Sequence, residues 1–118
     1  MPRSIWKLHL DSSSEDSARK IVNRCIKAFG RPPAESTIKK HSKGGYMATL
    51  ELLHNDKCSW SDVVVEVIEF GQRLGSGWSI LGNISSESNA VLSKSVGNHI
   101  GISGLQWVEW LVLNEHQA

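Results

Sequence analysis

Apolar and polar residues alternate in the segment that begins the chain. In SIWKLHLD, residues 4–11, an apolar residue recurs at every second position from Trp6 to Leu10. A repeat of two residues is that of a β-strand with one buried face. The segment YMATLELLH, residues 46–54, alternates in the same way. We therefore expect both segments to be strands that place one face in the core.

The segment LQWVEWLVL, residues 105–113, has an apolar row on each of its two faces. We expect Val108, Trp110 and Val112 to face the core. The second row is mostly apolar with one carboxylate, and it consists of Leu105, Trp107, Glu109, Leu111 and Leu113. A tryptophan beside a charged group on the second face of a strand is typical of a protein interface.

Two segments space their apolar residues three and four positions apart, as an amphipathic helix does. In residues 12–29 we expect Ser12 to begin a capping box and Gly30 to end the helix. In residues 59–74 we expect Ser59 to be the N-cap. The expected buried stripes are Ala18, Ile21, Val22, Cys25, Ile26 and Phe29 in the first helix, and Val63, Val64, Val67, Ile68, Gly71 and Leu74 in the second.

Three further segments have strand character. The basic segment 37–43 is too charged to be buried, so we expect it at a sheet edge. Residues 78–86 and 90–96 are expected to form a hairpin, followed by a loop at 97–104. Strands interleaved with two helices through short connections predict an α+β fold. We expect one domain, 1–118, with a single mainly antiparallel sheet of about four to six strands and both helices on one face.

Charge is distributed unevenly along the chain, although its net value is only +1. Residues 1–57 hold eleven Lys and Arg and six Asp and Glu, a balance of +5, whereas residues 58–118 have a balance of −4. This asymmetry predicts one basic and one acidic surface, each able to steer a partner of opposite charge. A fold that interleaves the two halves would cancel the field, and the sequence leaves both outcomes open.

The composition is that of an ordinary globular protein, 40% hydrophobic and 21% charged. No apolar run approaches the roughly 20 residues that span a bilayer, so we expect no membrane partner. The first residues contain no apolar signal core. Cys25 and Cys58 form neither a CxxC motif nor a disulfide framework. We therefore expect a reduced, cytoplasmic protein.

Residue types that carry catalysis or bind metals are present without the spacing that their chemistry needs. The five histidines have no His or Cys at ligand spacing, so we expect no metal site. HSKGG, residues 41–45, lacks the context that activates a nucleophile, and neither glycine-rich stretch matches a phosphate-binding loop. We expect no catalytic residues and no cofactor, and hence a protein that is not an enzyme.

A basic tract, residues 31–43, supports an alternative function. Arg31, Lys39, Lys40 and Lys43 could bind phosphates, and the nearby Tyr46 could stack on a base. A small nucleic-acid-binding module is therefore the second hypothesis. A solvated strand edge would have the same composition.

The face of the sheet opposite the helices is expected to carry a binding surface. Strand alternation collects seven residues on it: Lys7, His9, Met47, Thr49, Glu51, Trp107 and Glu109. Of these we expect Lys7, His9, Glu51, Trp107 and Glu109 to contact a partner, together with Glu66, Glu69 and Glu87 of the acidic half. A covering loop, a second copy of the chain, or an inverted orientation of the last strand would each remove this site.

The order of these elements resembles that of a known class of proteins. The helix ARKIVNRCIKAF, the strand YMATLELLHND, the helix WSDVVVEVIEFGQRLGSG and the strands WSILGNI and WVEWLVL are similar to those of small immunity proteins of bacterial polymorphic-toxin and contact-dependent inhibition systems. The resemblance covers most of the chain and lies in element order and hydrophobic pattern. It implies a cytosolic domain that binds and neutralises a cognate toxin domain, often a nuclease.

This chain departs from the resemblance in its charge. Many immunity proteins that neutralise nucleases are strongly acidic, whereas this chain is nearly neutral. If the resemblance holds, the acidic second half must contact the toxin, and the toxin's own contact surface carries mixed charge.

Overall fold

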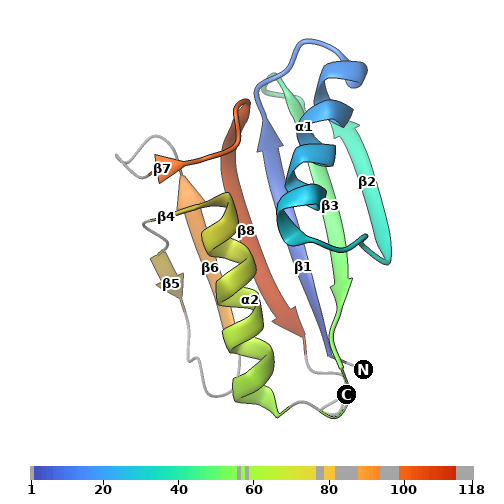
Figure 1. The fold of residues 1–118 in the computed structure, drawn as a ribbon. Helices are drawn as coiled ribbons and strands as arrows, with labels where there is room; N and C mark the ends of the chain where they lie inside the picture. The colour runs from blue at the N-terminus through green and yellow to red at the C-terminus, as the bar shows by residue number, and fades with distance from the viewer. Residues whose placement is uncertain are drawn as a thin grey trace.

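A computed structural model describes residues 2–55, 57, 59–76, 79–81, 88–93 and 99–113. Its described residues form, in chain order, β1 (Arg3–Leu10), α1 (Glu15–Phe29), β2 (Glu35–Lys40), β3 (Tyr46–Leu53), α2 (Trp60–Leu74), β4 (Gly75–Ser76), β5 (Ser79–Leu81), β6 (Ser88–Ser93), β7 (His99–Ile100) and β8 (Leu105–Leu113). Figure 1 shows both helices in front of one main sheet.

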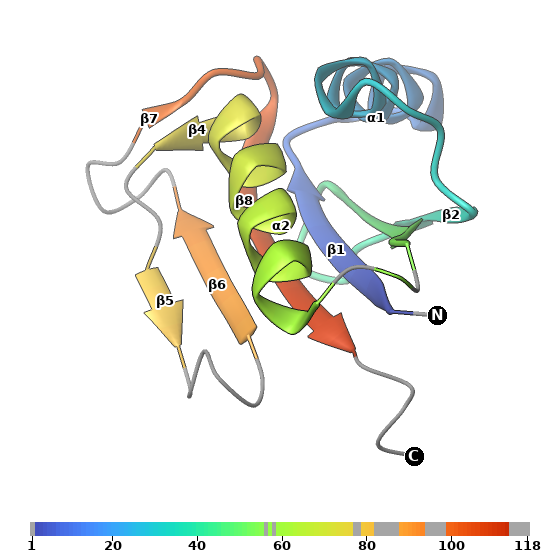
Figure 2. The ribbon, with the colours of Figure 1, turned by 60° about the horizontal axis from the view of Figure 1, so that its bottom comes forward.

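The main sheet has six strands in the order β2-β3-β1-β8-β6-β5, and every neighbouring pair is antiparallel. Both helices lie on the same face of it (Figure 2). The expected α+β fold, with one antiparallel sheet and two helices on one face, is confirmed. A second, two-stranded sheet pairs β4, directly after α2, with β7, which lies inside the segment 97–104 that was expected to be only a loop.

The helix-facing side of the sheet forms the core. Alternate residues of the three central strands are buried there, and the largest buried side chains include Trp6, Trp110 and Phe29. The Trp6 ring lies 4.9 Å from that of Phe29 and 6.2 Å from that of Trp110. Phe70 of α2 also packs into this core, although the predicted stripe omitted it.

The helix ends follow local side-chain chemistry. Ser59 caps α2 as expected, because its side chain accepts a hydrogen bond from the backbone N–H of Asp62. The cap of α1 is Ser14 and not Ser12, so that prediction was wrong. The Ser12 hydroxyl instead donates to the Ser14 carbonyl at 2.7 Å and braces the turn before the helix. Gly30 ends α1 at φ 82°, a left-handed conformation that favours glycine.

An irregularity at the start of β8 changes the side to which one predicted residue points. The register between β1 and β8 shifts after the pair His9 and Trp107, so that Leu10 pairs with Leu105 and Gln106 is the extra residue. An extra residue moves the preceding side chain to the other face of a strand. Leu105 is therefore 1% exposed in the core, and its predicted place on the second face was wrong.

The two halves of the chain stay apart in the fold. Strands β2, β3 and β1 form one side of the sheet with α1 over them, and strands β8, β6 and β5 form the other side with α2 over them (Figures 1 and 2). The basic first half and the acidic second half therefore occupy different sides of the molecule. Interleaving, which would have cancelled the charge asymmetry, does not occur in the described residues.

Candidate partner-binding face

The sheet face turned away from both helices is called the open face below. It carries, from the three central strands, Arg3, Ile5, Lys7 and His9 of β1, Met47, Thr49, Glu51 and Leu53 of β3, and Trp107, Glu109 and Leu111 of β8. All seven residues that the alternation assigned to this face lie on it. The orientation of the last strand was therefore predicted correctly from Trp107 onward.

The open face combines apolar side chains with charged ones. Leu53 is 43% exposed and Leu111 37% exposed, two of the most exposed large hydrophobic residues in the described chain. Ile5 lies directly opposite Leu111 in the strand register, and Trp107 lies opposite His9. No described helix packs on this face (Figure 2). Apolar area left open beside charged groups is the composition of a protein interface.

Charged residues on the open face occupy neighbouring strands. Lys7 and Glu109 are directly paired in the register of β1 and β8, so charges of opposite sign lie across from each other. Arg3 and Glu51 form an ion pair of 2.9 Å. The face thus offers a partner both a cation and carboxylates, with no single dominant sign.

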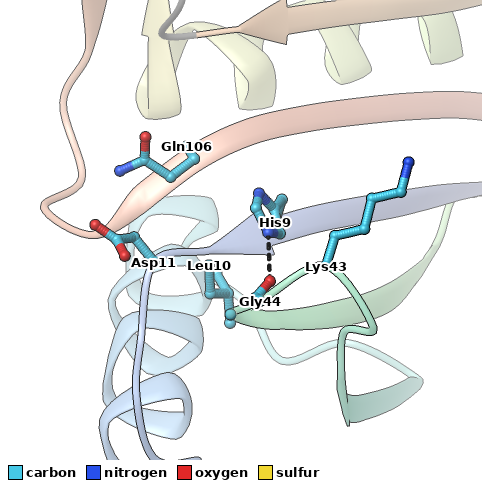
Figure 3. Close-up of a pocket in the computed structure, with 7 residues that line it drawn as sticks. His9, Leu10, Asp11, Lys43, Gly44 and Gln106 are labelled. Atoms are coloured by element: carbon cyan, nitrogen blue, oxygen red, sulfur yellow. Dashed lines mark hydrogen bonds between the residues drawn. The ribbon is translucent and has the colours of Figure 1, made fainter.

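One end of the open face is hollowed. A cavity of about 400 Å³ is lined by His9, Leu10, Asp11, Lys43, Gly44, Gly45 and Gln106. Figure 3 shows His9 between Asp11 and Gln106 on one side and Lys43 on the other. The His9 ring nitrogen Nε2 is 3.2 Å from the Gly44 carbonyl oxygen, which ties the β2–β3 hairpin to β1. The expected partner residue His9 is thus part of a shaped recess.

Glu66, also expected to contact a partner, lies away from the open face in a polar network. Its carboxylate is 2.6 Å from Nδ1 of His54 and accepts a 2.8 Å hydrogen bond from Arg31. On the other side of the ring, Nε2 of His54 is 2.8 Å from the hydroxyl of Ser4. The Ser4 oxygen also accepts from the Trp6 indole N–H at 2.9 Å. Glu66 is therefore used to hold α2 to β1 and to the residue after β3.

The order of atoms in this network is that of a serine–histidine–carboxylate triad, which the sequence did not predict. It is nevertheless sealed, because Ser4 is 0% and His54 2% exposed. A nucleophile must reach a substrate carbonyl, and the Ser4 oxygen is enclosed beneath the Trp6 indole that bonds it. The network can stabilise the fold, and its geometry does not support catalysis.

Burial sets the protonation of His54. Desolvation lowers the pKa of its ring below the ordinary value of 6.5, although Glu66 acts in the opposite direction. The ring is therefore neutral at physiological pH. Because the Glu66 carboxylate only accepts, Nδ1 carries the proton and Nε2 accepts from the Ser4 hydroxyl.

The remaining expected partner residues are scattered. Glu69 is exposed on α2, on the side of the sheet opposite the open face. Glu87 lies outside the described residues, as does Cys58. Arg31 belongs to the network of Glu66 and also stacks 5.0 Å above the Phe70 ring. The basic tract 31–43 is therefore divided, since Arg31 pairs with Glu66 whereas Lys39, Lys40 and Lys43 are exposed without a described ion pair.

Sequence reasoning missed two groups of residues. Ile5, Leu53 and Leu111 add apolar area to the open face, and the alternation placed them on this side of their strands, but they were not included among the expected partner residues. Ser4 and His54 are 50 positions apart, and no local spacing indicates that they meet.

The described residues contain no cluster of three or more His, Cys, Asp or Glu that could hold a metal ion. None of the helices in the described chain has the length and apolar content required to cross a membrane. Comparisons of the chain with models of protein families, with curated proteins and with solved structures found no match.

Proposed function

We propose that this chain is a cytoplasmic immunity protein that binds a cognate bacterial toxin domain through its open face and is not an enzyme. The observation that carries the proposal is the open face itself, where no described helix covers Trp107 or the apolar pair of Ile5 and Leu111. The charged pair of Lys7 and Glu109 lies between them in the strand register. Aromatic residues are enriched among the energetic hot spots of interfaces, and polar groups commonly surround them.

The mixed charge of this face fits a protein partner better than a nucleic acid. Lys7 and Glu109 lie side by side, so a partner must supply a carboxylate and a cation at adjacent positions. A polyphosphate backbone supplies only negative charge and would be repelled by Glu109 and Glu51. The alternative of nucleic-acid binding through residues 31–43 is weakened by the engagement of Arg31 with Glu66.

The test uses the protein encoded immediately upstream of this chain's gene, since toxin and immunity genes are expected to be adjacent. That protein is produced in bacteria alone and together with the chain, and growth and binding are measured. We expect growth arrest that the chain relieves, and a complex whose dissociation constant rises about thirtyfold in Trp107→Ala, equivalent to about 2 kcal/mol.

The matched control is Val65→Ala. Val65 is a large hydrophobic residue that is 55% exposed, but it lies on α2 and away from the open face. It should leave binding and protection unchanged. Equal losses in Trp107→Ala and Val65→Ala, or full protection by both variants, would contradict the open face as the toxin-binding surface. An upstream protein that neither binds the chain nor arrests growth would contradict the proposed function.

A further inference from the structure

Strand β2 ends the sheet on its basic side, and none of the described strands lies beside its outer edge. The sheet order begins with β2, and all of its residues except the half-buried Ile38 are exposed. Figure 1 shows β2 at the margin of the sheet, beyond α1. A sheet edge of this kind presents unpaired backbone groups to solvent, and these can pair with another extended chain.

The register determines which backbone groups face outward. His41 donates its N–H to the carbonyl of Gly45, so these two residues form a hydrogen-bonded pair. The register of β2 and β3 continues this pairing, with Lys39 opposite Met47 and Thr37 opposite Thr49. Hydrogen-bonded pairs alternate along an antiparallel ladder, so Thr37 and Lys39 direct their N–H and C=O groups to β3. Ser36, Ile38 and Lys40 must then direct theirs away from the sheet.

The hydrogen bonds between β3 and β1 agree with this assignment. His54 donates its N–H to the carbonyl of Pro2, in the register of β1 and β3. Even-numbered residues of β3 therefore bond to β1, which leaves the odd-numbered ones for β2. The outer edge of β2 consequently presents an alternating series of backbone N–H donors and C=O acceptors, which belong to Ser36, Ile38 and Lys40.

Cations flank this edge. Lys39, Lys40 and Lys43 are exposed, and no described carboxylate lies within ion-pair distance of any of them. Lys39 belongs to the open-face side of β2 and Lys40 to the helix side, as their register partners Met47 and Tyr46 indicate. An extended chain along the edge would therefore have a cation above it and another below it.

We propose that the β2 edge binds an extended acidic polypeptide segment, which adds to the sheet as a further strand. A polypeptide matches the alternating donors and acceptors of the edge, whereas the phosphodiester groups of a nucleic acid offer acceptors only. A second copy of the chain is disfavoured, because two such edges would bring six lysines together against one Glu35 from each copy. The β2 edge and the open face are different surfaces, so a partner can occupy one without the other.

The test uses the whole chain labelled with ¹⁵N and a blocked peptide of about eight residues, an ordinary strand length, that alternates glutamate with valine. Hydrogen exchange is followed residue by residue. We expect saturable binding that slows exchange of the Ser36, Ile38 and Lys40 amides and leaves those of Thr37 and Lys39 unchanged. Binding should weaken as salt is added, because exposed charges are screened.

The variant Ser36→Pro removes one outward N–H group and leaves the hydrogen bonds between β2 and β3 intact. A proline is tolerated at this position because β2 is an edge strand. It should weaken peptide binding about tenfold, the value of one backbone hydrogen bond. Ser36→Ala keeps the N–H and should bind as the original chain does. Thermal unfolding of both variants should match that of the original chain, which shows that the sheet is intact.

A copy of the peptide with every amide N-methylated retains its charge and loses its donors, so we expect no binding. Equal binding of this copy, or exchange protection that is absent from the even-numbered residues, would overturn strand addition. Tighter binding of a single-stranded oligonucleotide than of the peptide would assign the edge to nucleic acid instead. Protection of the same amides on concentrating the chain alone would assign it to a second copy. A negative result with the peptide would not change the outcome of the toxin experiment, because that experiment measures the effect of Trp107→Ala on the open face.

Discussion

Replacing each of the two tryptophans of β8 tests which face of this strand is core. Trp110 is 1% exposed, pairs with Trp6 in the register and lies 6.2 Å from its ring. Trp107 is half-buried on the open face, three positions earlier. The two residues share a strand and a side-chain type, so a difference between the effects of their replacement reports the face of the sheet on which each one lies.

The loss of stability expected for Trp110→Ala can be estimated from the area that this side chain buries. A tryptophan removes about 200 Å² from water, which at about 25 cal/mol per Å² amounts to about 5 kcal/mol. Alanine retains a part of this and the surrounding core relaxes, so we expect the free energy of unfolding to fall by about 3–5 kcal/mol. The corresponding fall in melting temperature is about 10–20 °C for a chain of this size.

Trp107→Ala should cost less than about 1 kcal/mol, because its side chain is already partly in water. Guanidinium unfolding followed by far-UV circular dichroism measures both variants. Partner affinity is measured separately, and there Trp107→Ala should have the larger effect. If Trp107→Ala destabilises the chain as much as Trp110→Ala does, both faces of β8 are core. The open face would then not be available to a partner.

Three further predictions concern parts of the fold away from β8. Burial lowers the pKa of His54 below 6.5, so the stabilisation that its neutral ring provides is complete above pH 6.5 and is lost as the pH falls toward the folded-state pKa. Urea unfolding should therefore give a smaller free energy of unfolding at pH 5 than at pH 7.5. The variant His54→Gln should remove this difference. Burial raises the pKa of the Cys25 thiol to about 12, so iodoacetamide at about pH 8, near the ordinary thiol pKa, should label Cys25 only after unfolding, as read by peptide mass spectrometry. Gly45→Ala should destabilise the chain by more than Gly44→Ala, because both have positive φ but only the methyl group at Gly45 would meet the Leu10 carbonyl; equal melting temperatures would contradict this contact.

The faces of the strands could be predicted from the sequence because burial imposes a period of two. The alternation from Trp6 to Leu10 and from Trp107 to Val112 correctly separated core from open face. It failed at Leu105, since the extra residue Gln106 reverses the alternation. That bulge depends on tertiary contacts, among them the 2.8 Å hydrogen bond from the Asp11 N–H to the Gly104 carbonyl. Hydrophobic order along one strand does not record such a bond.

Helix positions were predictable and one helix start was not. Ser12, Ser13 and Ser14 can each cap a helix, so the sequence allows three starts within one turn. The structure begins α1 at Glu15, where the acidic side chains of Glu15 and Asp16 lie in its first turn and favour the positive end of the helix dipole. A local pattern with equivalent candidates cannot distinguish among them.

The polar network and the open face together bear on the choice between catalysis and binding. An enzyme exposes its nucleophile in a cleft and supports it with buried packing. The Ser4 network has the reverse arrangement, because the hydroxyl of Ser4 is enclosed with His54 in the core, whereas Trp107 is left partly in water. The enclosed groups are mutually satisfied by hydrogen bonds, so they need no ligand. The part of the Trp107 side chain that is in water would be stabilised by burial against the surface of a partner. This contrast supports a role in which the open face is completed by a partner.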